Sequence, residues 1–209
     1  ERDRRVIIVL DTSRTSAGRV GDQPRLDAAM DAALLLAALA SRAGDRVDFL
    51  AGDRWLRARV AAAANRTTLL NDLVQAMAPL DPALLEASWP TLASAIADTS
   101  RRRALVVLLT PLEPAAIQES LLPSLPALTR HHRVVIASVA DPAIAALAET
   151  RETTKDAYAA AAAERTMALQ DRTAAVLRRM GVAVIDASPA ELPPKLADHY
   201  LMLKAQGLL

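Results

Sequence analysis

Residues 5–15 read Arg-Val-Ile-Ile-Val-Leu-Asp-Thr-Ser-Arg-Thr, and this stretch decides the fold of the chain. Its apolar run, residues 6–10, is rich in Val and Ile, which predicts a strand buried on both faces of a sheet. Asp11 follows this run directly, and the hydroxyl residues Ser13 and Thr15 come at alternate positions after it. Because open α/β sheets bind ligands beyond the carboxyl ends of their strands, these three residues are candidates for a functional site. One carboxylate and two hydroxyls are hard oxygen ligands of the kind that Mg²⁺ or Mn²⁺ prefers.

The composition indicates a globular protein without a strong overall charge. The 209 residues are 52% hydrophobic and only 2% aromatic, so the core must consist mainly of Leu, Val, Ile and Ala. The 25 Lys and Arg nearly balance the 24 Asp and Glu, so no overall field attracts nucleic acid or anionic lipid. Residues 101–103 form one basic cluster, which we expect at the C-terminal end of a helix, where cations interact favourably with the helix dipole. The chain has no cysteine, which excludes a thiol nucleophile, disulfides and cysteine-ligated zinc.

Strand and helix patterns alternate along the rest of the chain. Further strands are predicted over residues 46–51, 54–60, 104–109, 134–139 and 182–185. Helices are predicted over residues 26–40, 67–77 (capped by Asn65 or Thr67), 91–101, 114–122, 125–130, 142–180 with a break near 149–154, and 189–206. The alternation predicts an α/β fold, a doubly wound, mostly parallel six-stranded sheet with one antiparallel edge hairpin and the strand order 3-2-1-4-5-6. That order places Asp11 beside Thr110, and no linker divides residues 1–209, which we expect to form one domain.

No apolar run approaches the roughly 20 residues that a membrane-spanning helix needs. The chain also opens without a signal peptide and without an initiator methionine. We therefore expect a domain excised from a longer protein, with any membrane anchor outside these residues.

Four segments recur, in order, in a known bacterial family. They are Leu-Asp-Thr-Ser-Arg-Thr at 10–15, Ala-Gly-Asp-Arg-Val at 43–47, Arg-Arg-Ala-Leu-Val-Val-Leu-Leu-Thr at 102–110 and His-Tyr-Leu-Met-Leu-Lys-Ala-Gln-Gly at 199–207. On these segments the whole chain resembles the von Willebrand factor A-like domain of the family catalogued as domain of unknown function 58. The resemblance implies a Rossmann-like von Willebrand factor A fold, in which the Asp-x-Ser-x-Ser/Thr pattern opens a metal-ion-dependent adhesion site.

The resemblance also implies a cellular setting. Such proteins usually carry membrane-spanning segments upstream of this domain and are often encoded beside MoxR-type AAA+ ATPases. We therefore expect a bacterial, cytoplasmic domain of a membrane-associated protein of the inner membrane. Its expected partner is a MoxR-type AAA+ ATPase in an assembly or chaperone-like function, with no nucleic-acid partner and no membrane contact by these residues.

Carried over by resemblance, the metal site comprises oxygen ligands from three loops, Asp11, Ser13, Thr15, Thr91 and Glu113. The first three match the first family motif position by position. Thr91 is the hydroxyl nearest to the second motif, with Ser88 as the alternative.

The third motif departs from the family pattern. Family members tend to read Thr-Asp where this chain has Thr110-Pro111, and Glu113 is the acid that remains nearby. The loss of a carboxylate reduces the charge compensation for a divalent cation. The site therefore either binds Mg²⁺ or Mn²⁺, or is vestigial, with Asp11 held by hydrogen bonds from its own loop.

Three functions are compatible with these residues, and a non-enzymatic protein-interaction module is favoured over the other two. In that role Trp89 and Arg14 would contact the partner, although Trp89 is as well explained by packing on its own domain. A metal-dependent phosphoryl-transfer enzyme of haloacid-dehalogenase type also begins with an Asp after a buried strand, but Ser13 stands where its second Asp is needed. No phosphate-binding loop or nucleophile elbow is present, and the three histidines are predicted away from Asp11. The third function is a purely structural domain of a membrane-anchored assembly.

Overall fold

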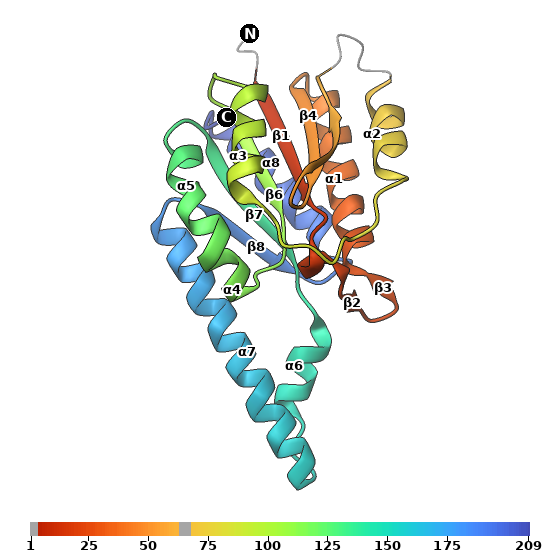
Figure 1. Ribbon diagram of the computed structural model, residues 1–209, viewed down its shortest axis with the longest axis vertical. Helices are drawn as coiled ribbons and strands as arrows, with labels where there is room; N and C mark the ends of the chain where they lie inside the picture. The colour runs from red at the N-terminus through yellow and green to blue at the C-terminus, as the bar shows by residue number, and fades with distance from the viewer. Residues whose placement is uncertain (1–3, 63–67) are drawn as a thin grey trace.

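The computed structural model describes residues 4–62 and 68–209, and its centre is a six-stranded sheet (Figure 1). The strands lie in the order β5-β4-β1-β6-β7-β8. Their bounds are β1 Arg5–Asp11, β4 Arg46–Gly52, β5 Leu56–Val60, β6 Leu105–Leu109, β7 Arg133–Val139 and β8 Ala183–Ala187. All neighbouring pairs are parallel except β4 and β5, which form an antiparallel hairpin at one edge. The predicted α/β class, hairpin and strand order are confirmed.

Strand β1 lies in the middle of the sheet and is covered on both faces. Its five apolar residues, 6–10, are all fully buried. Val6, Ile8 and Leu10 join the hydrophobic cluster on one face, and Ile7 and Val9 join the cluster on the other. A strand packed on both sides needs apolar residues at every position rather than at alternate ones, which explains the uninterrupted run in the sequence.

Helices cover both faces of the sheet. Helices α1 (Arg25–Arg42), α2 (Leu69–Met77) and α8 (Leu192–Ala205) pack on one face. The other face carries α3 (Trp89–Thr99), the C-terminal part of α7 (Thr154–Arg179) and the segment of α4 (Pro114–Ala116) and α5 (Leu122–Thr129). The two helices predicted around residues 114–130 are one continuous helical segment, because a π-helical turn, Ile117–Leu121, joins α4 to α5.

Several boundaries differ from the prediction. Helix α3 begins at Trp89 and ends at Thr99, so the basic residues 101–103 follow the helix in an exposed bend. The cluster thus lies next to the C-terminal end of the helix, but the helix ends two residues before the predicted residue 101, because Ser100 has extended backbone. The segment after β1, for which no helix or strand is predicted, holds a 3-10 turn, Arg14–Ala17, and a two-stranded hairpin of β2 (Arg19–Val20) and β3 (Gln23–Pro24). The proposed caps of α2, Asn65 and Thr67, lie outside the described residues.

Helix α6 (Pro142–Glu149) and the first half of α7 form a helical arm that projects from the carboxyl edge of the sheet (Figure 1). The predicted break between them is confirmed, and a capping box of Thr153 and Asp156 starts α7. Ala160 and Ala163 are buried within the arm, where small side chains let two helices approach closely. In the described part of the chain, no helix has the length and apolar character to cross a bilayer.

Candidate functional site

Asp11 is the last residue of β1 and the centre of a buried cluster of oxygen atoms. Its side chain is 1% exposed. Its Oδ1 accepts a hydrogen bond from the Ser13 N–H at 2.8 Å, and its Oδ2 accepts one from the Thr110 hydroxyl at 2.7 Å. The Thr15 hydroxyl donates to the same Oδ2 at 3.3 Å and lies 3.0 Å from the Ser13 hydroxyl. The expected meeting of Asp11 and Thr110 is therefore confirmed, and four side chains form one group.

Two local features bring these side chains together. The 3-10 turn after β1 reverses the chain, so Thr15 returns over the carboxylate of Asp11. Strands β1 and β6 are parallel neighbours in which Leu10 pairs with Leu109, so the next residues, Asp11 and Thr110, leave the sheet side by side. The cluster is thus a direct product of the strand order.

Burial gives the Asp11 carboxyl group an unusual protonation equilibrium. Loss of solvation raises its pKa, and the hydrogen bonds from Thr110, Ser13 and Thr15 offset this only in part. A buried carboxylate without a full positive counter-charge is stabilised by a proton or by a cation. The chemistry of the donors suits a hard cation, because one carboxylate and three hydroxyls are all oxygen ligands.

A small cavity of about 50 Å³ adjoins the cluster, with Asp11 and Thr110 on one side and Glu86, Glu119 and Ser120 on the other. Among the described residues, no three His, Cys, Asp or Glu side chains form a compact metal-binding group. A cation here would depend on the hydroxyls for most of its protein ligands.

Arg14 lies on the exposed rim of this site. Its guanidinium forms an ion pair with Glu86, and this pairing, with smaller contributions from Glu113 and Glu119, raises the pKa of Arg14. The carboxylates of Glu86, Glu113 and Glu119 therefore lie near Arg14 at this rim.

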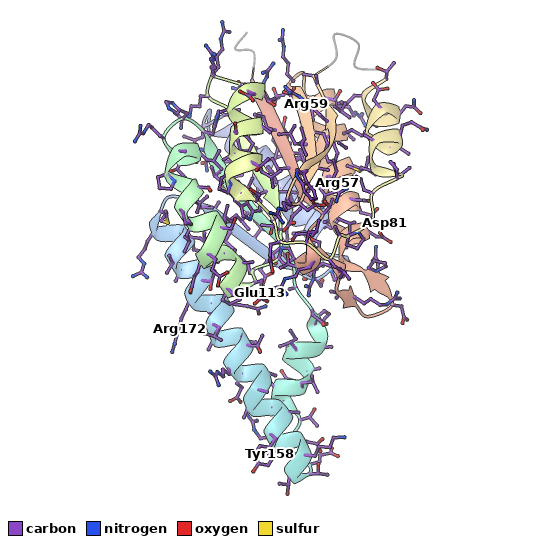
Figure 2. All side chains as sticks on the ribbon, in the orientation of Figure 1. Arg57, Arg59, Asp81, Glu113, Tyr158 and Arg172 are labelled. Carbon is purple, nitrogen blue, oxygen red and sulfur yellow. The ribbon has the colours of Figure 1, made fainter. Side chains whose placement is uncertain are left out.

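The two ligands predicted from more distant loops make no hydrogen bond to Asp11 among the described residues. The hydroxyl of Thr91 is 2.8 Å from that of Ser88 at the start of α3, and neither makes a hydrogen bond to the Asp11 cluster in the described structure. Glu113 is exposed, and Figure 2 shows it beside α4 at the carboxyl end of the sheet. Each stays a predicted ligand, whereas Thr110 contacts Asp11 directly.

Trp89 does not belong to the surface. It is the first residue of α3, and its side chain is 2% exposed within the core. The interpretation of Trp89 as an interface anchor was therefore wrong, and its alternative, packing on its own domain, is correct. The reason is that α3 begins two residues earlier than the sequence predicts, which turns this side chain inward.

Asp53 is a buried acid that the sequence analysis does not select, because it stands in a Gly-Asp turn pattern. Burial opposes its ionisation, but hydrogen bonds from Arg57 and the Trp55 N–H lower its pKa overall. Asp53 also accepts a hydrogen bond from the Thr12 hydroxyl at 3.2 Å. This hydrogen bond connects the β4–β5 turn to the residue that follows Asp11. Gly52 makes this turn possible, since a Cβ there would lie 2.6 Å from the Trp55 carbonyl oxygen.

The same turn presents an exposed aromatic residue. Trp55 is 55% exposed, and the guanidinium groups of Arg54 and Arg57 each lie 5.7 Å from the centre of its ring. Exposed Trp and Arg side chains are enriched among the residues that dominate binding energy at protein interfaces. Trp55 is thus the aromatic side chain that the structure places on the surface near this edge.

The three histidines are far from this chemistry, as predicted. His131 and His132 precede β7, at the edge of the sheet opposite Asp11. His199 lies on α8, and loss of solvation lowers the pKa of both His132 and His199.

The strand order and the Asp-x-Ser-x-Thr cluster at the end of the central strand define a von Willebrand factor A-like domain. The model of the family described as "Protein of unknown function DUF58" matches residues 1–179, and the chain belongs to this family. The C-terminal motif at 199–207 lies beyond the matched residues. No match is found among curated proteins.

Solved structures with the same fold are distant in sequence. The conserved hypothetical protein BatB from Bacteroides thetaiotaomicron is 11% identical with a TM-score of 0.55, over 96% of this chain and 99% of that one. A variant of the PilB minor pilin from Streptococcus sanguinis is 12% identical with a TM-score of 0.53, over 97% of this chain and 62% of that one. An aerotolerance-related membrane protein from Bacteroides fragilis is 14% identical with a TM-score of 0.46, over 65% of this chain and 67% of that one. At these identities the first two comparisons show a shared fold.

Proposed function

We propose that this protein is a non-enzymatic protein-interaction module that binds its partner at the carboxyl edge of the sheet, around Asp11. The single observation that carries the proposal is the Asp11 cluster. It combines a buried, incompletely compensated carboxylate with three hydroxyls at the edge where this class of sheet binds ligands.

A Mg²⁺ or Mn²⁺ ion would be held by Asp11, Ser13 and Thr15, with Thr110 close by. A carboxylate from the partner would complete its coordination and supply the negative charge that Pro111 removes from this chain. Thr91 and Glu113 complete the predicted ligand set through water or through loop movement on binding.

The surface around the ion adds contacts of its own. Trp55 and the arginines beside it lie on the turn that Asp53 and Thr12 connect to the Asp11 loop. Arg14, exposed on the other side, provides a charge for an acidic partner. We propose a MoxR-type AAA+ ATPase as this partner, in an assembly or chaperone-like function of a bacterial membrane-associated protein; family membership supports this choice.

Calorimetric titration of Mg²⁺ and Mn²⁺ into the 209-residue chain tests the metal site. We expect saturable binding in the micromolar-to-millimolar range that the Asp11→Ala variant loses. An Asp22→Ala variant, which removes an exposed acid outside the cluster, should bind as the unmodified chain does. Absence of binding by the unmodified chain would show a vestigial site.

Capture of the neighbouring MoxR-type ATPase tests the surface. We expect Trp55→Ala to reduce capture with or without metal, whereas Asp11→Ala should reduce it only when Mg²⁺ is present. Undiminished capture by the double variant would exclude this edge as the interface.

Neither of the other two functions, phosphoryl transfer or a purely structural role, is favoured by an observation at the described residues.

A further inference from the structure

A second, larger cavity lies between the helical arm and the carboxyl ends of β7 and β8. Its volume is about 330 Å³. Its walls come from α6, from α7 and from the segment after β8, and it shares no lining residue with the cavity beside Asp11. We call it the arm groove, and define it by Ile144, Met167, Asp171, Arg178, Asp186 and Glu191.

The arm groove carries more negative than positive charge. Four carboxylates line it, from Asp141, Asp171, Asp186 and Glu191, against the guanidinium of Arg178. Two of these acids already have local partners. Asp141 caps α6 by accepting the Ala143 N–H at 2.9 Å, and Glu191 pairs with Lys195 at 3.3 Å.

The other two acids are Asp171 on α7 and Asp186 on β8, and Asp186 has a hydrogen-bond partner in Ser138. In the described part of the chain, neither makes an ion pair within 4 Å. Loss of solvation beside the groove raises the pKa of Asp186, and the charge of Asp171 raises it further, while Ser138 and Arg25 offset these effects in part. Both carboxylates line the groove, so a positive group bound between them would interact favourably with both.

The groove also offers apolar surface. Leu112, Ile144, Met167 and Ala174 contribute to its walls. Beyond the groove, the arm carries Leu147, which is 49% exposed, and Tyr158, which is 77% exposed and lies at the far end of the arm in Figure 2.

We propose that the arm groove binds a basic segment of a partner protein, with an Arg or Lys side chain between Asp171 and Asp186 and apolar neighbours against Ile144 and Met167. The charge complementarity of the groove selects the basic side chain. The apolar walls of the groove select a peptide segment over a free small cation, which would gain nothing from contact with them. The site is separate from the Asp11 cluster, so it goes beyond the interaction proposed there.

A matched pair of peptides tests this proposal. The probe is acetyl-Ala-Leu-Arg-Leu-Ala-amide, and the control replaces its arginine with citrulline, which keeps the shape and removes the charge. Titration into the ¹⁵N-labelled chain should give saturable NMR shifts of the backbone amides of Asp171, Ala174 and Asp186, and the citrulline peptide should give little shift.

Two double variants test whether Asp171 and Asp186 bind the arginine of the peptide. The double variant Asp171→Asn/Asp186→Asn should bind the arginine peptide about tenfold more weakly, as expected for the loss of two solvent-accessible charge pairs. The control double variant Asp98→Asn/Asp198→Asn makes the same change of charge at exposed acids outside the groove. Its dissociation constant for the arginine peptide should stay within about twofold of that of the unmodified chain. The amide spectra themselves report whether each variant folds.

Three results of these titrations would overturn the proposal. They are an absence of saturable shifts at the groove, equal binding of the citrulline peptide, and an equal loss of affinity in the control variant. Concentration-dependent self-association of the unliganded chain through the same amides would also overturn it, because the occupant would then be a second copy.

Discussion

The Tyr200 hydroxyl donates a hydrogen bond to Asp45 Oδ2 at 2.5 Å, across 155 positions of the chain. Lys204 strengthens this contact with its Nζ 2.8 Å from Asp45 Oδ1 and 2.7 Å from the Ala43 carbonyl oxygen. The two sides of this contact come from the motifs at 43–47 and 199–207 that carry the resemblance to the family. These motifs therefore hold α8 against the turn between α1 and β4, and their role is structural rather than part of the candidate site.

Replacing Tyr200 with Phe should destabilise the protein by about 1.5–3 kcal/mol, the usual contribution of a hydrogen bond to a charged group. Asp45 is 7% exposed, so water replaces the lost donor poorly. Urea unfolding followed by circular dichroism measures the change.

The matched control for this change is Tyr158→Phe, because Tyr158 is 77% exposed on the arm. It should alter the free energy of unfolding by less than about 0.5 kcal/mol. Equal effects of the two substitutions would show that the contact with Asp45 contributes nothing.

Replacement of the two tryptophans by alanine should affect the stability of the protein very differently. Trp89→Ala removes a large side chain from the core and should cost about 3–5 kcal/mol of stability. Trp55→Ala removes an exposed side chain and should change stability by less than about 0.5 kcal/mol while it weakens partner capture. Thermal unfolding of both variants, beside the capture assay, separates the two roles; a stable Trp89→Ala variant would contradict the buried position.

Asp11→Asn should stabilise the protein near pH 7 by about 0.5–2 kcal/mol, because functional sites often keep groups that destabilise the folded protein. Since burial raises the pKa of Asp11, the native state binds this proton more tightly than the unfolded chain does. The unmodified protein therefore loses stability as the pH rises from the ordinary Asp value through the raised one.

The gain from Asp11→Asn should accordingly shrink as the pH is lowered, because Asp11 then becomes neutral in the unmodified protein as well. Urea unfolding of both proteins as a function of pH measures this difference. A variant that is less stable at every pH would show that the hydrogen bonds to the carboxylate outweigh its burial.

Pro111→Asp should restore the carboxylate that family members tend to carry after the threonine. It adds a negative charge next to Thr110 and should raise Mg²⁺ affinity about tenfold, because cation affinity increases with the number of charged ligands. Calorimetry of the single variant, and of the same variant with Asp11→Ala, measures the gain and its dependence on the cluster. An unchanged affinity would mean that position 111 does not face the ion.

Most of the fold could be predicted from the sequence because its signals are local. The buried run at residues 6–10, the Gly-Asp turns and the alternation of strand and helix patterns depend on neighbouring residues alone. Topological rules then leave few orders for six strands, and these rules placed Asp11 beside Thr110. Helix ends were less predictable, since the start of α3 depends on how Trp89 packs into the core.

The sequence by itself thus determined the α/β class, the strand order and the edge of the sheet where Asp11 lies, since burial on both faces of a central strand imposes a recognisable run of residues. Only the tertiary structure decided which tryptophan is exposed, that Asp53 supports the first loop, and that Asp171 and Asp186 face one groove. These relationships join segments far apart in the chain. They arise from the packing of whole helices and strands, which local residue patterns do not encode.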